Sequence, residues 1–339
     1  MKRYCLASGC DFALHTGDIF YPVGTMSTTD SRLRDRFEGP YAPLGIPIHM
    51  SLGNHDYYPP ASPEAAIQYT HLSPSKAWHL PARNYTFLEH GIRFLALDTN
   101  RPNVEQEAWA LEVLARSRRD GEGWVIAFGH HPRLSDGRHG DADGDVGPWL
   151  DRILCHRVDL LISGHDHVLE VMKPRCGVHQ VVTGGGGAEL YDLAPTTNGR
   201  FEARSHGFVA LTVKGPELHA NFIDQDSNKL CEMTWQKASN AEICGADGIC
   251  NGRCPSDPDC AKESCGTNSV CNLACTDDPD CLPPGACGCD REPLICEVRS
   301  AGSSEICGCD AACQVIAKVC TADGTCDSGC RPGSDPDCR

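Results

Sequence analysis

The sequence of 339 residues contains few of the features that mark membrane-spanning or nucleic-acid-binding proteins. No apolar run approaches the ~18 residues of a membrane helix, so we expect no membrane span. Positive charge is scarce, since 30 Lys and Arg stand against 46 Asp and Glu, a net charge of -16. This balance argues against nucleic acid or an anionic membrane surface as the main partner. The opening stretch MKRYCLASGC also lacks the ~7–15-residue apolar core of a signal peptide.

Cysteine, in contrast, is abundant and unevenly placed. Of 23 Cys, eighteen lie between Cys244 and Cys338. The segments 244–260 and 265–281 share the spacing C-x5-C-x3-C-x5-C, and 320–338 keeps it with two residues added in the last gap. These units have almost no apolar residues, so covalent cross-links must supply their order. The spacing is too tight for zinc knuckles and the tail has no His, which favours disulfides over zinc. Ca²⁺ is a weaker alternative, because no copy has the full ligand spacing of a calcium loop.

The first part of the chain alternates apolar strands with helical stretches, which predicts a layered α/β domain. We place this catalytic domain at residues 1–236 and the acidic Cys-rich region at 237–339. One helix is expected at 104–119, where apolar residues recur at helical spacing. Strands are expected at 12–16, 46–52, 92–98, 124–128, 159–163, 179–183, 207–213 and 217–223.

Four of these strands end in the same way. Each is followed by Gly and then by a residue type that can bind a metal, in the stretches Gly17-Asp18, Gly53-Asn54-His55-Asp56, Gly129-His130-His131 and Gly164-His165-Asp166-His167. Gly permits a sharp turn, and sites in open α/β sheets form at the carboxyl ends of strands. One such His is usually an ordinary polar residue. Four strand ends of this kind predict a metal site, with Tyr21 close by.

The motif set G-D, G-N-H-D, G-H-x-P and G-H-x-H resembles the calcineurin-like metallophosphoesterases. The Tyr of GDIFY and the stretch GHHPRLSDGRHG are similar to those of purple acid phosphatases of the small, tartrate-resistant type. The resemblance covers roughly residues 5 to 235. It implies a four-layer α/β/β/α sandwich with two mixed sheets, followed here by the small disulfide-rich region.

The resemblance also implies a pair of metal ions, Fe³⁺ with a divalent ion that is Zn²⁺, Fe²⁺ or Mn²⁺. Such a pair can bind a phosphate ester and lower the pKa of a bound water. The expected ligands are Asp18 as the bridge, Tyr21 and His167 on the ferric ion, and Asn54, His130 and His165 on the divalent ion.

Three further residues are expected beside the substrate. The resemblance places His55 over the substrate phosphate, as stabiliser or general acid, with Asp56 orienting it. His139, nine residues after His130, is expected to be a second substrate-side His. His131 is expected at the rim of the site, and the stretch TGGGGAEL at 183–190 is expected to be a tight turn beside it.

One motif of the family has no counterpart in the sequence. The family carries an earlier strand that ends in an Asp ligand of the ferric ion, some tens of residues before the position of Asp18. We therefore expect the first strand of the fold, its motif and any signal peptide to be missing, with truncation as the leading explanation. Six of seven ligand side chains remain.

Three functions stay open on this basis. The first is an exported dinuclear phosphomonoesterase acting on a small phosphorylated substrate. The second is a phosphodiesterase of the same fold, which Tyr21 and His139 disfavour. The third is a non-catalytic surface protein with an incomplete metal site, whose tail binds a cell-surface or extracellular partner. We expect an extracellular, cell-surface or periplasmic location.

Overall fold

The computed structural model describes residues 1–119, 123–142, 144–194 and 198–237, together with the backbone of 296–300, 303–309 and 315–320. The chain divides into two compact units, with the main division near residue 244. The tail repeats predicted to form disulfides lie outside the described residues. The predicted domain boundary between 236 and 237 stays a prediction. No helix of the described residues is both long and apolar enough to cross a bilayer.

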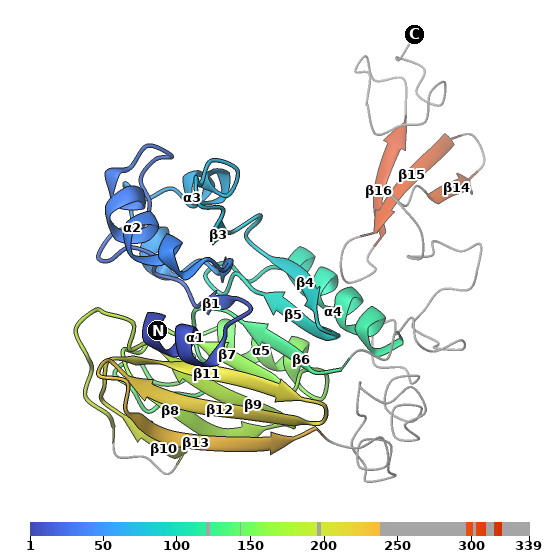
Figure 1. Cartoon of the computed structure of the whole chain (residues 1–339). Helices are drawn as coiled ribbons and strands as arrows, with labels where there is room; N and C mark the ends of the chain where they lie inside the picture. Colours follow the sequence, from blue (N-terminus) through green and yellow to red (C-terminus); the bar gives the residue numbers. More distant parts are fainter. Residues whose placement is uncertain are drawn as a thin grey trace. The chain divides into compact units, whose positions relative to one another are not determined.

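A seven-stranded mixed sheet lies at the centre of the first unit, with the strand order β10-β8-β9-β7-β6-β5-β4 (Figure 1). β5, β6, β7 and β9 run parallel, while β4, β8 and β10 pair antiparallel at the two sides. The strands are β4 (Tyr85–Glu89), β5 (Ile92–Ala96), β6 (Val125–Phe128), β7 (Leu160–Ser163), β8 (Leu169–Arg175), β9 (Val178–Thr183) and β10 (Gly199–Ala203). β6 and β7 are buried at every residue, as expected of central parallel strands.

The next layer consists of two smaller sheets. One is parallel, in the order β1 (Ala13–His15), β2 (Ile48–Met50) and β3 (Trp78–His79). The other is an antiparallel meander of β11 (Gly207–Lys214), β12 (Glu217–Asp224) and β13 (Lys229–Gln236). The α/β fold with mixed sheets is thus as predicted, but strand pairing divides the second layer into a parallel and an antiparallel part.

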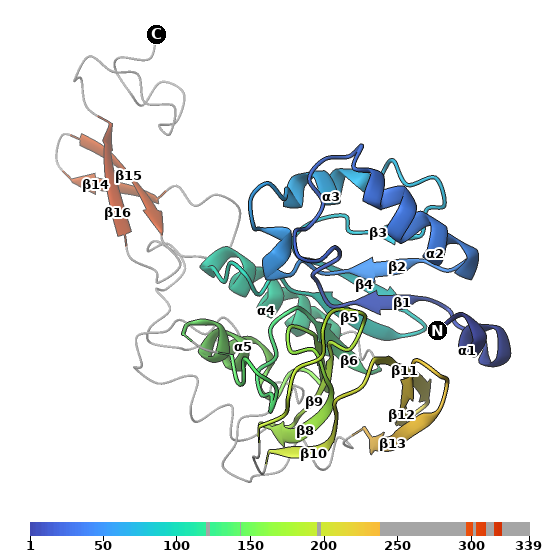
Figure 2. The same ribbon diagram turned by 90° about the vertical axis from the view of Figure 1, so that its left-hand side faces the viewer.

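Helices cover both outer sides of these sheets, as the view in Figure 2 shows. α4 (Val104–Arg119) and α5 (Val146–Leu154) pack on one face of the large sheet, where Leu95, Ala127 and Leu161 meet Leu114 and Trp149. On the side of the parallel sheet lie a π-helical turn (Leu33–Glu38), α2 (Gly39–Tyr41), a 3₁₀ turn (Ala42–Leu44) and α3 (Pro63–Tyr69), whereas Tyr4 of α1 (Lys2–Ser8) contacts Phe208 of the antiparallel sheet. α3 begins at Ser62, whose Oγ accepts a hydrogen bond from the N–H of Ala65 at 3.1 Å.

The main core lies between the large sheet and the two small sheets. Phe94, Ile126 and Phe128 from the large sheet belong to the same buried cluster as Met50 and Phe222 from the small ones. Burial of this apolar area holds the two sheet layers together. The carboxyl ends of β1, β2, β6 and β7 are thereby fixed along one edge of the sandwich.

The second unit contains a small antiparallel sheet of β14 (Cys296–Ser300), β15 (Ser303–Cys309) and β16 (Val315–Cys320). The sequence contained no clear strand signal there.

Candidate metal centre

The four Gly-containing loops predicted from the sequence do meet in the structure. Two of them follow β1 and β2 of the parallel sheet, and two follow β6 and β7 of the large sheet. The centre therefore lies where the carboxyl ends of strands from two different sheets come together, the usual position for a site in this class of fold.

Glycine is required at these strand ends because the loops touch through their backbones. A Cβ on Gly53 would lie 2.1 Å from Asp18 Oδ1, and one on Gly164 would lie 2.6 Å from Thr16 Oγ1. Gly17, at a φ of +92°, would place a Cβ 2.6 Å from the backbone N of Gly53 and 2.8 Å from His130 Nδ1. A side chain at any of the three positions would push the loops apart.

His130 lies at the middle of the centre, with 1 % of its surface exposed. Its Nδ1 lies 2.8 Å from the carbonyl oxygen of Thr16, which can only accept, so Nδ1 carries the proton and donates. The lone pair of Nε2 therefore points to the other side. It faces Asn54 Oδ1 at 2.8 Å, His165 Nδ1 at 3.0 Å and Asp18 Oδ2 at 3.4 Å.

Asn54 is oriented with its Nδ2 toward the hydroxyl of Tyr58, to which it donates at 2.8 Å. In this orientation its Oδ1 and His130 Nε2 meet as two acceptors with no hydrogen between them. Such a contact is repulsive unless a cation accepts both lone pairs. The donor set of imidazole nitrogens, amide oxygen and carboxylate is one that Zn²⁺, Fe²⁺ and Mn²⁺ accept. The residues present therefore fit a metal ion.

Burial keeps the histidines of this group neutral. It lowers the pKa of His130 well below the ordinary value, helped by neighbouring His131 and His165, and it lowers the pKa of His165 to about 3. Burial likewise raises the pKa of Asp18 to about 6, although the N–H of His55 donates to its Oδ1 at 2.9 Å. The group is thus rich in lone pairs and poor in positive charge, a condition that a bound cation relieves.

Asp56 ties the two loops of the parallel sheet together. Its Oδ2 accepts hydrogen bonds from the backbone N–H of Gly53 at 2.8 Å and of Asp18 at 3.0 Å. Burial raises the pKa of Asp56 to about 7. The sequence suggested that Asp56 orients the ring of His55. The structure instead gives that role to the carbonyl oxygen of Pro22, which contacts His55 Nδ1, because the Asp56 carboxylate faces the two backbone amides.

Tyr21 and His167 lie on the other side of the centre. The Tyr21 ring is 4.2 Å from the ring of His55 and 5.5 Å from that of His167, centroid to centroid. His167 Nδ1 donates to the carbonyl oxygen of Glu189 at 2.6 Å, which leaves the lone pair on Nε2. Metal-binding His residues usually donate their second ring N–H in this way.

Two residues, His131 and Tyr191, make contacts at the centre that the sequence did not indicate. His131, expected at the rim, is half-buried, and a ring nitrogen of it lies within 4.8 Å of ring nitrogens of His130 and His165. Its Nδ1 pairs with Thr99 Oγ1 at 2.8 Å. Tyr191 stacks on His167 at 4.1 Å, and only its position shortly after TGGGG could have indicated this. His139 stacks on His165 at 4.3 Å, so it does lie beside the centre.

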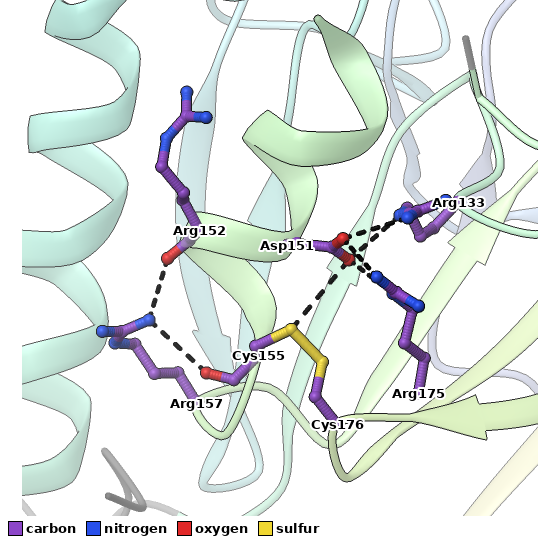
Figure 3. The surroundings of a disulfide bond; sticks show 7 residues. All are labelled: Arg133, Asp151, Arg152, Cys155, Arg157, Arg175 and Cys176. Carbon is purple, nitrogen blue, oxygen red and sulfur yellow. Dashed lines mark hydrogen bonds and ion pairs between the residues drawn. A yellow bond between two sulfur atoms is a disulfide. The ribbon is translucent and has the colours of Figure 1, made fainter.

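A second group of ligand-type residues consists of Asp151 on α5, Cys155 just after this helix and Cys176 between β8 and β9 (Figure 3). Cys155 and Cys176 form a disulfide, which excludes the pair as thiolate ligands. Asp151 is held instead by the guanidinium groups of Arg133 and Arg175. A second disulfide joins Cys5 and Cys10 near the amino terminus. The sequence had indicated neither pairing.

The comparisons with known proteins agree with this geometry. Residues 2–169 match the family model described as calcineurin-like phosphoesterase. The chain belongs to this family. Tartrate-resistant acid phosphatase type 5 of Sus scrofa is 26% identical over 272 residues, covering 69% of this chain and 78% of that protein. Purple acid phosphatase 3 of Arabidopsis thaliana is 28% identical over 243 residues, covering 63% and 65%.

The structure is also similar in fold to a solved one, GAP50, the anchor in the inner membrane complex of Plasmodium. The TM-score is 0.56 at 17% sequence identity, over 70% of this chain and 82% of that chain. By the family match and these two relatives, the chain is a metallophosphoesterase, distantly related to the acid phosphatases. Enzymes of this family are typically metal-dependent hydrolases of phosphoesters.

Proposed function

We propose that the chain is a dinuclear phosphomonoester hydrolase of the acid phosphatase type. The observation that carries the proposal is the contact between His130 Nε2 and Asn54 Oδ1, two acceptors 2.8 Å apart, with Asp18 and His165 beside them. The presence of Tyr21 and His139 next to this group supports a monoesterase over a phosphodiesterase.

Six side chains would hold the two metal ions. We assign Tyr21 and His167 to Fe³⁺, because a phenolate suits a hard ferric ion, and Asn54, His130 and His165 to a divalent ion, which is Zn²⁺, Fe²⁺ or Mn²⁺. Asp18 would bridge the two. When bound, such a pair supplies a nucleophile derived from water and stabilises the attacking and leaving oxygens of an in-line displacement.

The other residues would act on the substrate. His55 Nδ1 is held by the carbonyl oxygen of Pro22, so its Nε2, 4.0 Å from Asp18 Oδ2, is the atom that faces the centre. A protonated His55 would donate this Nε2–H to the leaving-group oxygen as general acid. His139 would stabilise the phosphoryl group from the side of His165. Asp56 would act through the backbone, by keeping the loops of Asp18 and Gly53 in register.

The two disulfides of the first unit are typical of an exported protein. Disulfides such as Cys5–Cys10 and Cys155–Cys176 persist in oxidising compartments. We therefore propose an extracellular, cell-surface or periplasmic location. Residues 1–236 would form the catalytic domain, and the acidic Cys-rich region 237–339 would bind a cell-surface or extracellular partner.

The test combines metal content with turnover. The purified chain should hold two metal ions and hydrolyse p-nitrophenyl phosphate far faster than bis(p-nitrophenyl) phosphate. His165→Ala should lose at least one metal and its turnover, whereas the exposed His71→Ala should keep both. A preference for the diester would favour a phosphodiesterase. Loss of neither metal nor activity in His165→Ala would refute the assignment of the site.

A further inference from the structure

Two loops form a wall of the centre, one in contact with His165 and the other with His167. The first, residues 133–140, is fixed from below by buried hydrogen bonds. Ser135 Oγ donates to Asp166 Oδ2 at 2.7 Å and lies 2.9 Å from Glu170 Oε2. The N–H of His139 donates to Asp166 Oδ1 at 2.8 Å. This end of the loop is therefore preorganised rather than free to move.

The second loop, residues 189–194, is fixed against the first. The N–H of Tyr191 donates to the carbonyl oxygen of His167 at 3.2 Å, and that of Ala194 donates to the carbonyl oxygen of Asp136 at 2.7 Å. The Tyr191 ring stacks on His167 at 4.1 Å and meets the ring of His139 edge-on at 5.4 Å. Tyr191 thus has one position and one orientation beside the centre.

Arg138 lies on this wall with its guanidinium carbon 5.5 Å from the centre of the Tyr191 ring. Its side chain is exposed, and none of the ion pairs found among the described residues includes it. A guanidinium over an aromatic face keeps its N–H donors at the edge of the plane, where they can bind a carboxylate or phosphate.

The net charge of the chain makes the positive charge of Arg138 relevant to substrate binding. At a net charge of -16 the protein as a whole repels anionic substrates. Arg138 has no carboxylate partner in the described part of the chain and comes directly before His139, so it offers local positive charge beside the substrate that the centre would bind. A neutral leaving group would gain nothing from it, whereas an anionic one would.

We propose that Arg138, supported by Tyr191, forms a subsite for a second anionic group, so that the preferred substrates are phosphomonoesters whose leaving group carries a carboxylate or another phosphate. The proposal rests on the phosphomonoesterase function above. Arg138 determines specificity and Tyr191 positions it. An exposed ion pair of this kind is worth about a 2- to 5-fold preference at low salt.

The experiment compares two substrates of equal shape, 4-carboxyphenyl phosphate and its neutral amide, 4-carbamoylphenyl phosphate. The ratio of their kcat/KM values is measured for wild type, Arg138→Ala, Arg138→Lys and Arg116→Ala. Arg116→Ala removes the same charge from the exposed face of α4, where Arg116 pairs with Glu112. Comparing ratios cancels the intrinsic difference in reactivity between the substrates.

We expect the ratio to fall about 2- to 5-fold in Arg138→Ala, to fall less in Arg138→Lys and to stay at the wild-type value in Arg116→Ala. The preference of wild type should also weaken as salt is raised from 0.01 to 0.5 M. An unchanged ratio in Arg138→Ala, with phosphatase activity present, would overturn the subsite and leave the proposed function standing.

The same comparison can be made without turnover. If wild type hydrolyses neither substrate, the dissociation constants of 4-carboxybenzyl phosphonate and 4-carbamoylbenzyl phosphonate are measured by calorimetry. A preference for the carboxylate that disappears in Arg138→Ala would support the subsite even though the proposed catalysis had failed. Equal affinities, or no binding of either phosphonate, would overturn the subsite.

Discussion

The ion-pair cluster around Asp151 predicts a measurable loss of stability when one charge is removed (Figure 3). Asp151 lies on α5 and receives two bidentate pairs. Arg133, from the loop that follows His131, binds it at 3.0 Å through both Nε and Nη2. Arg175, at the end of β8, binds it at 2.9 and 2.8 Å. The substitution Asp151→Asn keeps the shape of the side chain and removes its charge.

The magnitude follows from how well each pair is shielded from water. The side chains of Arg133 and Asp151 are 17% and 24% exposed, so this pair should contribute about 1.5–2 kcal/mol, near the lower end for hydrogen bonds to charged groups. Arg175 is 45% exposed, and its pair should add about 0.5 kcal/mol. Asp151→Asn should therefore lower the free energy of unfolding by about 2 kcal/mol.

The effect should depend on pH in a defined direction. Burial of Asp151 acts to raise its pKa, but the hydrogen bonds from Arg175 and Arg133 outweigh it, so that the pKa is lowered overall. A lowered carboxyl pKa contributes stability that is present above the usual value near 4 and is lost as the pH falls through the folded-state pKa. The difference between wild type and Asp151→Asn should be full at pH 6 and shrink below about pH 3.5.

Urea unfolding followed by tryptophan fluorescence measures this difference, because Trp149 lies buried on the same helix. The matched control is Glu107→Gln, which breaks the bidentate pair with Arg152 at 2.9 Å, where the arginine is 56% exposed. The control should lose less than ~1 kcal/mol. A loss in Asp151→Asn no larger than that of the control, or one that does not change with pH, would refute the reasoning.

Two further predictions concern the centre and its support. Gly53→Ala should abolish metal binding, because the added Cβ would lie 2.1 Å from Asp18 Oδ1. The control Gly186→Ala has open space around it and should keep the metal content of wild type. Equal metal content in both variants would contradict the role of the close loop contact. Burial raises the pKa of Glu170 to about 7, so its contribution to stability is present below about pH 4.5 and is lost as the pH rises to 7. Glu170→Gln should therefore gain on wild type by up to ~3 kcal/mol in the metal-free protein across that range, and a pH-independent difference in urea midpoint would contradict it.

The strands and the main helix could be predicted because their signal is local. The expected helix at 104–119 is α4 with the same bounds, and the eight expected strands are all present, five of them shorter by one to four residues and three of them longer by one. Apolar periodicity does not indicate where the pairing of strands stops, so the ends of the strands differ from those expected. In the first unit β3, β4, β8, β10 and β13 were not predicted, since they lie at or near sheet edges and mix apolar with polar residues.

The ligand-type residues could also be predicted from the sequence, because glycine followed by His, Asp or Asn at a strand end is a pattern of neighbouring residues. That these loops meet was a hypothesis, and the contacts of Gly17, Gly53 and Gly164 confirm it. The assignment of individual side chains to two metal ions stays a proposal.

By itself, the sequence determined the class of fold, the family and the four loops that carry the centre. Each of these depends on residues close together in the chain. Only the tertiary structure decided which atoms face one another: His130 Nε2 toward Asn54, Asp56 toward backbone amides rather than His55, and Tyr191 against His167. These contacts join residues from different sheets and loops. Their geometry is set by packing between layers, and packing leaves no periodic mark on the sequence.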